Sequence, residues 1–146
     1  MEPKLFDLIL TIRRRCMATE ERITRELDIT MAEFNALLAI DPKERILGHD
    51  FSTKMGLSPS RGSRVIDRMN RQGFLHVQDV PSDRRCSQVR LSSKGLRLKR
   101  KIEQRLHECE KRILSNLSAR QEKQLVGNLQ ILVEAMASGP VMAEAR

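Results

Sequence analysis

Four arginines recur in the middle of the chain at steps of three, four and three residues, namely Arg61, Arg64, Arg68 and Arg71. Residues three and four apart share one face of a helix, so this spacing predicts a helix with a guanidinium-lined front. Val65, Ile66 and Met69 fall on the opposite side and predict an apolar back that packs against the rest of the fold. A short helix of this kind is suited to meet a polyanion.

Residues at both ends of the arginine segment indicate where this helix begins and ends. Ser58 is a good N-cap and Pro59 a good first helical residue, whereas Gly73 fits the position that follows a helix. Gly56 suits the tight turn of a helix-turn-helix, and Gly62 lies on the inward side, where a missing side chain permits close helix–helix approach. The segment therefore predicts the second helix of a helix-turn-helix.

The 146 residues carry a formal net charge of +8, concentrated in one part of the chain. Residues 54–105 hold 14 Lys and Arg against four acids, a net charge of +10, whereas the remainder has a net charge of −2. A focused positive field attracts nucleic acid and supplies phosphate contacts. Trp and Tyr are absent and only four Phe occur, which disfavours stacking of single-stranded bases on aromatic side chains. We therefore expect a duplex as the partner.

Before the arginine segment, the apolar periodicity predicts three helices. The first covers residues 4–27, with a stripe formed by Leu5, Ile9, Ile12, Cys16, Ile23 and Leu27. Thr30 and Glu33 form a capping-box pattern that opens a second helix, which ends at Asp41 because the residue before a proline avoids helical geometry. A third, short helix is expected over residues 49–55, with Phe51 and Met55 facing inward.

Beyond the arginine segment, the pattern changes to alternation. Residues 74–78 and 88–92 alternate apolar and polar side chains and predict two strands, joined by a polar, basic loop at residues 80–86. Two helices follow. The stripe of the first is Leu98, Ile102, Leu106, Cys109 and Ile113, and that of the second is Leu125, Leu129, Leu132 and Met136. Ser118 is the expected N-cap of the last helix, which Gly139 and Pro140 are expected to end before a frayed terminus.

The three cysteines, Cys16, Cys86 and Cys109, show no close pairing, which favours a reducing cytoplasm over a disulfide scaffold. Cys16 and Cys109 lie on apolar stripes and are expected to be small core residues. No stretch approaches the ~18 apolar residues of a membrane span, and the first residues lack the apolar run of a signal peptide. We therefore expect a cytoplasmic protein without membrane contact.

Two motifs in the right order and spacing resemble the MarR family of regulators over about residues 5–136. The first is the run from Met55 through Ser60 followed by Ser63 through Met69 and by Gly73 through Leu75. The second is Pro81 through Arg85 followed by Val89 through Gly95, which resembles the family's wing and the entry to its next helix. Ser92 stands where threonine is usual, and Arg61 and Gly62 replace a commoner threonine–valine pair.

The resemblance implies a mainly α fold with a small β-hairpin wing, a winged helix-turn-helix at residues 30–92. Helical dimerisation regions at residues 1–29 and 93–146 would flank it. The family consists of homodimers that put one recognition helix per subunit in a major groove and a wing in the adjacent minor groove. Many members are repressors that release DNA when a small phenolic or other effector binds. We therefore expect a homodimeric repressor of a pseudo-palindromic double-stranded operator, relieved by a small-molecule effector.

The expected DNA-binding residues are Ser58, Ser60, Arg61, Ser63, Arg64, Arg68, Arg71, Asp83, Arg84 and Arg85. Residues early in a recognition helix reach base edges, so Ser60, Arg61, Ser63 and Arg64 are expected there. Arg68 and Arg71, farther along, are expected to meet phosphate or to pair within the protein, whereas Ser58 is mainly the helix cap. In the wing, the family motif assigns Asp83 to orienting Arg85, which enters the minor groove, while Arg84 meets phosphate.

No catalytic constellation appears: the sequence has no glycine-rich phosphate loop, nucleophile elbow or HExxH spacing, so we expect neither an enzyme nor a cofactor. Glu103, His107 and Glu110 share a helix face, which is more typical of a hydrated surface than of a metal site. Two alternatives to the repressor stay open. One is a winged-helix protein–protein adaptor, and the other is an oxidant-sensing regulator that acts through Cys16, whose neighbours Arg13 to Arg15 would favour a thiolate.

Overall fold

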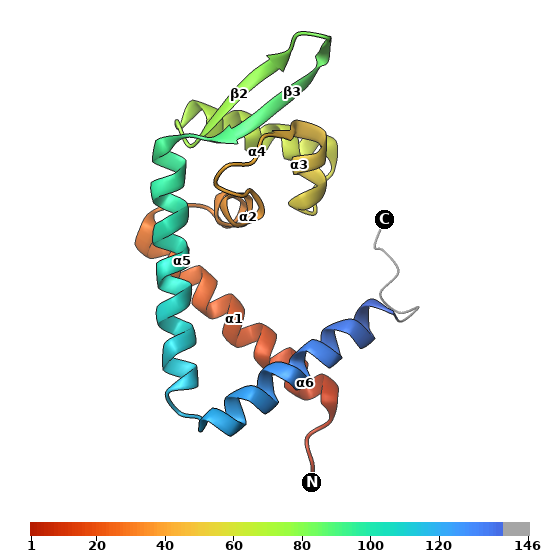
Figure 1. The fold of residues 1–146 in the computed structure, drawn as a ribbon, viewed down its shortest axis with the longest axis vertical. Helices are drawn as coiled ribbons and strands as arrows, with labels where there is room; N and C mark the ends of the chain where they lie inside the picture. The colour runs from red at the N-terminus through yellow and green to blue at the C-terminus, as the bar shows by residue number, and fades with distance from the viewer. Residues whose placement is uncertain (139–146) are drawn as a thin grey trace. The chain divides into compact units, whose positions relative to one another are not determined.

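The computed structural model describes residues 1–138, apart from the side chain of Arg84. The elements follow one another along the chain as labelled in Figure 1: α1 (Leu5–Leu27), α2 (Met31–Ala39), β1 (Ile46–Leu47), α3 (Gly48–Lys54), α4 (Pro59–Arg71), β2 (Leu75–Val80), β3 (Asp83–Leu91), α5 (Ser93–Leu114) and α6 (Ala119–Ala137). The mainly α fold with a small β wing is thereby confirmed. The expected end of the last helix at Gly139 and Pro140 lies outside the described residues.

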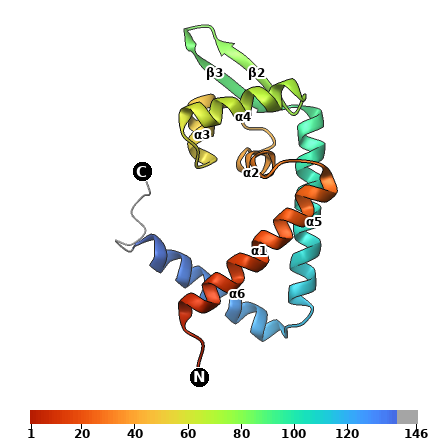
Figure 2. The ribbon, with the colours of Figure 1, turned by 180° about the vertical axis from the view of Figure 1, so that it is seen from behind.

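The chain forms two compact units, Met1–Arg105 and Leu106–Arg146, and the boundary falls inside α5. The first unit contains α1 to α4, the sheet and most of α5. Within it, Figures 1 and 2 show α2, α3 and α4 gathered on one side of the β2–β3 hairpin. The division into a DNA-binding segment at residues 30–92 and flanking dimerisation segments stays a prediction.

The helix-turn-helix is formed by α3 and α4, as expected. Gly56 has a positive φ of 69° in the turn, a conformation that side chains other than glycine rarely adopt. Ser58 is the N-cap of α4 and Pro59 its first residue. Gly62 is buried against α3, and a Cβ added there would lie 1.9 Å from Ser52 Oγ. The absence of a side chain at this position therefore sets how closely the two helices pack.

The sheet has three strands in the order β1–β3–β2, all antiparallel. The sequence-based prediction of only two strands was wrong, because the two-residue strand Ile46–Leu47 is too short to show alternation. It pairs with Val89 and Gln88 of β3. The loop predicted at residues 80–86 was also too long. β3 begins at Asp83, so the polar residues that suggested a loop continue the hairpin ladder instead.

The core of the first unit lies where α2, α3 and α4 meet the sheet, and α1 and α5 each contribute one fully buried large side chain to it. Its fully buried large side chains are Phe34, Phe51, Ile23, Leu37, Ile40, Met69, Leu75, Ile102 and Val89. The apolar back of α4 contributes Ile66 and Met69, which are 4% and 0% exposed. Removing this apolar area from water is the main stabilising contribution to the unit.

The start of α5 is tied to the end of α4. Ser92 Oγ accepts a hydrogen bond from Gly95 N at 2.9 Å and donates one to the carbonyl of Gly73. Any side-chain hydroxyl can both donate and accept, so serine makes the same two hydrogen bonds at this position, where threonine is usual in the family that the sequence resembles. A Cβ added at Gly95 would lie 2.0 Å from the Phe74 carbonyl oxygen, so this glycine lets α5 begin directly against the base of β2.

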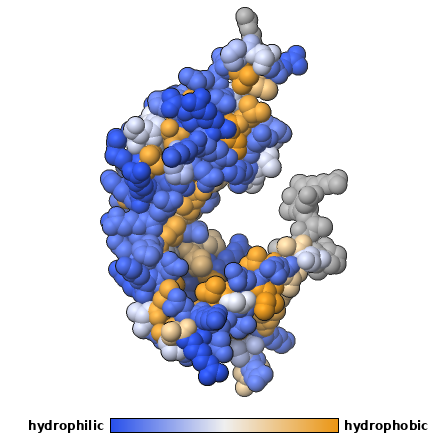
Figure 3. Space-filling view, in the orientation of Figure 1, coloured by the Kyte–Doolittle hydropathy of each residue, from blue (hydrophilic) through white to orange (hydrophobic). Residues whose placement is uncertain are grey.

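In the second unit, α6 begins at a capping box in which Ser118 and Gln121 exchange hydrogen bonds with each other's backbone N–H groups. None of the residues of α6, all of which the structure describes, is buried. Its exposed large apolar side chains are Leu125, Val126, Leu129, Ile131 and Val133. Figure 3 shows apolar side chains gathered on this helix.

Helix α1 also exposes apolar side chains over its first half: Leu5, Phe6, Leu8, Leu10, Ile12 and Met17. Cys16 is exposed as well, so its interpretation as a core residue of the single chain was wrong. The apolar stripe of α1 begins to be buried only near its end, at Ile23. Cys109 is half-buried rather than fully enclosed.

Candidate nucleic-acid interface

The front of α4 carries the arginines predicted from their spacing. Arg61, Arg64, Arg68 and Arg71 are all exposed, whereas the opposite side of the helix is buried. At the N-terminal end, Ser60 and Ser63 are also exposed. Ser58 Oγ accepts a long hydrogen bond of 3.4 Å from Arg61 N, so its main observed role is to cap the helix. The structure therefore brings the seven α4-region candidates onto one short helix and its cap.

Arg68 differs from the other three arginines because it has a partner. Its Nε lies 3.3 Å from Glu33 Oε1, and the Glu33 side chain is only 3% exposed. The other oxygen of Glu33, Oε2, accepts the backbone N–H of Thr30 at 2.9 Å and completes the capping box of α2. The sequence pattern identified Glu33 only as a cap, because its spacing reveals neighbours on its own helix and not on α4.

The wing candidates lie at the turn between β2 and β3. Asp83 Oδ1 accepts a hydrogen bond from the backbone N–H of Arg85 at 3.0 Å. The contact is thus to the backbone of Arg85 and fixes the chain direction at the tip, while the exposed Arg85 side chain extends from it. Arg84 belongs to β3, but its side chain lies outside the described part of the structure.

Cys86 is joined to the same carboxylate. Its Sγ donates a hydrogen bond to Asp83 Oδ2 at 3.4 Å. This hydrogen bond, together with burial and the negative charge of Asp83, raises the pKa of the Cys86 thiol above its ordinary value. The thiol is therefore kept protonated, which disfavours the nucleophilic thiolate form.

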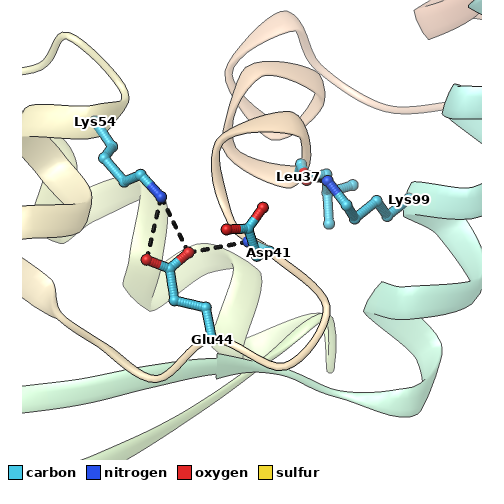
Figure 4. Close-up of polar contacts among 5 residues, drawn as sticks. All are labelled: Leu37, Asp41, Glu44, Lys54 and Lys99. Atoms are coloured by element: carbon cyan, nitrogen blue, oxygen red, sulfur yellow. Dashed lines mark hydrogen bonds and ion pairs between the residues drawn. The ribbon is translucent and has the colours of Figure 1, made fainter.

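Two polar contacts connect elements of the first unit that pack near α3 and α4, and Figure 4 shows both. Glu44 accepts hydrogen bonds from Asp41 N at 3.0 Å and from Lys54 Nζ at 3.0 and 3.1 Å, which ties the loop after α2 to the end of α3. The Asp41 hydrogen bond is the larger cause, and Lys54 the next, of a lowered pKa for Glu44.

The second contact is made by Lys99 of α5, which is 4% exposed. Its Nζ donates to the Leu37 carbonyl at 2.9 Å and lies 3.3 Å from Glu103 Oε1. Leu37 is in the last turn of α2, where carbonyls lack helical partners, so the ammonium caps that helix end. The structural role of Lys99 was not predicted from the sequence, although its position four residues after Gly95 and three before Ile102 places it on the buried side of α5.

A cavity of about 600 Å³ lies between α3, α4 and the inner face of the hairpin. Its lining includes Ser63 and Asp67 of α4, His49 and Asp50 of α3, and Asp79, Arg85 and Cys86 of the hairpin. Two of the expected DNA-binding residues, Ser63 and Arg85, therefore border one hollow in the protein surface. The sequence did not reveal this cavity, because its lining residues come from three separate segments.

The three residues considered for a metal site do not converge on one point, and each makes a polar contact. Glu103 pairs with Lys99, and His107 Nδ1 lies 3.4 Å from Glu110 Oε2. Among the described residues, no three His, Cys, Asp or Glu side chains are grouped to hold a metal ion. In the same part of the chain, no helix is both long and apolar enough to cross a membrane.

A family model described as MarR family matches residues 27–85, which span α2, the helix-turn-helix and the tip of the wing. Over these residues the chain is similar to the MarR family. It is 23% identical over 120 residues to the transcriptional repressor MprA of Escherichia coli K12, a match that covers 81% of this chain and 68% of MprA. The residues matched by the family model include the helix-turn-helix, and MprA is named a transcriptional repressor.

Solved structures of MarR, MepR and PcaV have the same fold. Apo MarR from E. coli superimposes with a TM-score of 0.76 at 21% identity, covering 90% of this chain and 98% of MarR. A MepR F27L mutant from S. aureus bound to an oligodeoxyribonucleotide gives 0.62 at 18% identity, covering 92% and 99%. PcaV from Streptomyces coelicolor, in complex with its natural ligand, gives 0.65 at 21% identity, covering 92% and 98%.

Proposed function

We propose that this protein is a MarR-family homodimeric repressor, which binds a pseudo-palindromic DNA operator and is released by a small-molecule effector. The observation that carries the proposal is the exposed arginine front of α4 beside a hairpin whose tip presents Arg85. The two basic elements are positioned by one core, so they can engage one duplex together. MprA is named a repressor, and MepR has been crystallised with an oligonucleotide, which supports the same role here.

Dimerisation is supported by the apolar surfaces of the terminal helices. Leu125, Leu129 and Val133 of α6 are exposed, and α6 buries none of its residues within the chain. An amphipathic helix is stabilised mainly by burying its apolar side, so α6 requires a partner surface. A second copy supplies an identical surface and generates the twofold symmetry that a pseudo-palindromic operator needs.

The proposed contacts follow the direction of α4. Ser60, Arg61, Ser63 and Arg64 near its N-terminus would face base edges in the major groove, where a bidentate arginine–guanine pair contributes about 1–3 kcal/mol of discrimination. Arg71 would meet phosphate. Arg85, and Arg84 beside it, would follow the hairpin to the adjacent minor groove and backbone, with Asp83 holding the tip.

The cavity of about 600 Å³ beside α4 is the candidate effector site. PcaV, with its natural ligand bound, supports a ligand-responsive role for this fold. Asp50, Asp67 and Asp79 line the cavity against a single arginine, Arg85, so its lining is net negative. We therefore expect a neutral or cationic effector rather than a carboxylate, and its binding would compete with DNA for Ser63 and Arg85.

Selection of bound duplexes from random DNA, followed by fluorescence-anisotropy titration of the recovered site, tests the proposal. We expect a site with two inverted half-sites and an affinity that falls as salt rises. Equal binding of all duplexes at every salt concentration would contradict it.

An Arg61→Ala/Arg85→Ala variant separates the regulator from a protein–protein adaptor. Loss of duplex binding and of repression of a reporter placed behind the selected site, with the dimer intact by sedimentation, supports the regulator. Unchanged repression by this variant would support the adaptor.

A further inference from the structure

Glu33 is a buried carboxylate that lies beside α4, the helix proposed to read DNA. Its side chain is 3% exposed, and Oε2 accepts the Thr30 backbone N–H. Oε1 is enclosed and has no hydrogen-bond partner of good geometry among the described residues. The only cation paired with it in that part of the chain is the Arg68 guanidinium, whose Nε lies 3.3 Å away. A buried anion is strongly unfavourable without a compensating cation, so the guanidinium of Arg68 is needed beside Glu33 to keep the fold stable.

The same pair limits what Arg68 is free to do. The Arg68 side chain is 55% exposed and shares the face of α4 with Arg61, Arg64 and Arg71. Those three arginines have no ion pair among the described residues, so they can turn to a phosphate without breaking a contact. If Arg68 turned to a phosphate, Glu33 would be left enclosed and uncompensated. A solvent-exposed phosphate contact is worth less than this loss, because exposed ion pairs are weak.

We propose that Glu33 is a positioning residue for α4. Glu33 holds the Arg68 side chain against the protein, so that Arg68 is not one of the residues that contact phosphate. Arg68 then links α4 to the N-terminus of α2 and fixes the position of α4 relative to that end of α2. Arg71 neutralises phosphate. The inference rests on the proposed DNA-binding function and assigns different roles to two arginines that look equivalent in the sequence.

The slope of log affinity against log salt counts the phosphates neutralised, at about 0.9 per contact, or about 1.8 when a substitution occurs in both subunits of a dimer. We would measure this slope by anisotropy on the selected operator. Arg68→Gln should leave the slope unchanged, whereas the matched control Arg71→Gln on the same helix face should flatten it by about 1.8. An unchanged slope for Arg68→Gln shows that Arg68 neutralises no phosphate, and a second variant tests whether Glu33 is the cause.

Glu33→Gln gives the opposite test. Glutamine still accepts the Thr30 N–H and keeps the capping box, but it releases Arg68. The slope should then steepen by about 1.8, which corresponds to roughly a tenfold greater loss of affinity over a fourfold rise in salt. The double variant Glu33→Gln/Arg68→Gln should return to the wild-type slope, because the released arginine is gone.

Flattening by Arg68→Gln equal to that of Arg71→Gln would overturn the inference, as would an unchanged slope in a folded Glu33→Gln variant. Circular dichroism checks folding, and if either single variant does not fold, the double variant Glu33→Gln/Arg68→Gln, which leaves no buried charge unpaired, is compared with Arg71→Gln: a wild-type slope supports the inference and a slope flattened by about 1.8 overturns it. Failure of the proposed function gives a different result, since wild-type protein would then show no operator preference at all.

Discussion

Helices α4 and α6 have opposite relations to the chain that contains them. On α4, Gly62, Ile66 and Met69 are buried and the arginines face outward. On α6 no residue is buried, and Leu129 and Val133 are 41% and 66% exposed. The first helix is held by its own chain and presents charge to a partner, whereas the second presents apolar area.

The difference indicates two kinds of partner. Exposed guanidiniums stay hydrated without a partner and can bind a polyanion, so α4 is complete as a folded element without DNA. Exposed leucine and valine side chains gain free energy by leaving water, so α6 is complete only against another apolar surface. Substitutions that affect one of these helices and leave the other intact test this difference.

The largest effect is expected at α6. Leu129→Asp would place a charge in the proposed subunit interface and weaken the dimer by about 3 kcal/mol, or roughly 100-fold in dissociation constant. The matched control Gln130→Asp adds the same charge to an exposed polar position on the same helix and should leave the dimer intact. Sedimentation velocity measures both variants. A dimer unaffected by Leu129→Asp would show that α6 does not contribute to association.

The next effect is expected inside the helix-turn-helix. Gly62→Ala would press a Cβ against Ser52, with Oγ at 1.9 Å and the backbone Cα at 3.0 Å. Overpacking exceeds the gain in helix propensity, so the free energy of unfolding should fall by about 2 kcal/mol in urea titrations. At Gly127 on α6 an added Cβ meets nothing within 4 Å, and Gly127→Ala should instead stabilise by about 1 kcal/mol. Equal effects at the two glycines would contradict the packing described here.

A smaller effect is expected at the front of α4. Arg64→Ala should weaken binding to the selected operator by about 1.5 kcal/mol and relax the base preference at one position of each half-site. Arg71→Ala should weaken binding to all duplexes by a similar factor and leave the base preference unchanged. Competition titrations with single-base variants of the operator distinguish the two. A uniform loss for Arg64→Ala would move it to the phosphate contacts.

The smallest effect is expected in the loop between α2 and β1, where Glu44 lies. The folded pKa of Glu44 is lowered from its ordinary value of 4.5, so the stabilisation from this carboxylate is present above that value and is lost as pH falls through the folded pKa. At neutral pH, Glu44→Gln should lower the free energy of unfolding by about 1 kcal/mol. The difference between wild type and variant should shrink below pH 4.5. A difference that does not depend on pH would rule out the ionised carboxylate as its cause.

Local patterns predicted α4 well because every signal for it is local. Ser58, Pro59 and Gly73 mark its ends, and the arginine spacing states which side faces out. The capping box at Thr30 was equally readable. Strand β1 was missed because two residues carry no periodicity, and the hairpin was predicted too short because the basic residues of its tip resemble a loop. The burial of Cys16 was predicted wrongly because an apolar stripe indicates which side of a helix tends to be buried, but not whether the same chain buries it.

The helices, their caps and the basic front of α4 follow from local sequence, since each depends on residues within one or two turns of one another. Three relations appear only once the chain is folded: Glu33 pairs with Arg68, Lys99 caps α2, and Ser63 and Arg85 border one cavity. These relations join residues that are distant along the chain. They depend on how helices pack in three dimensions, and no spacing within a segment records that packing.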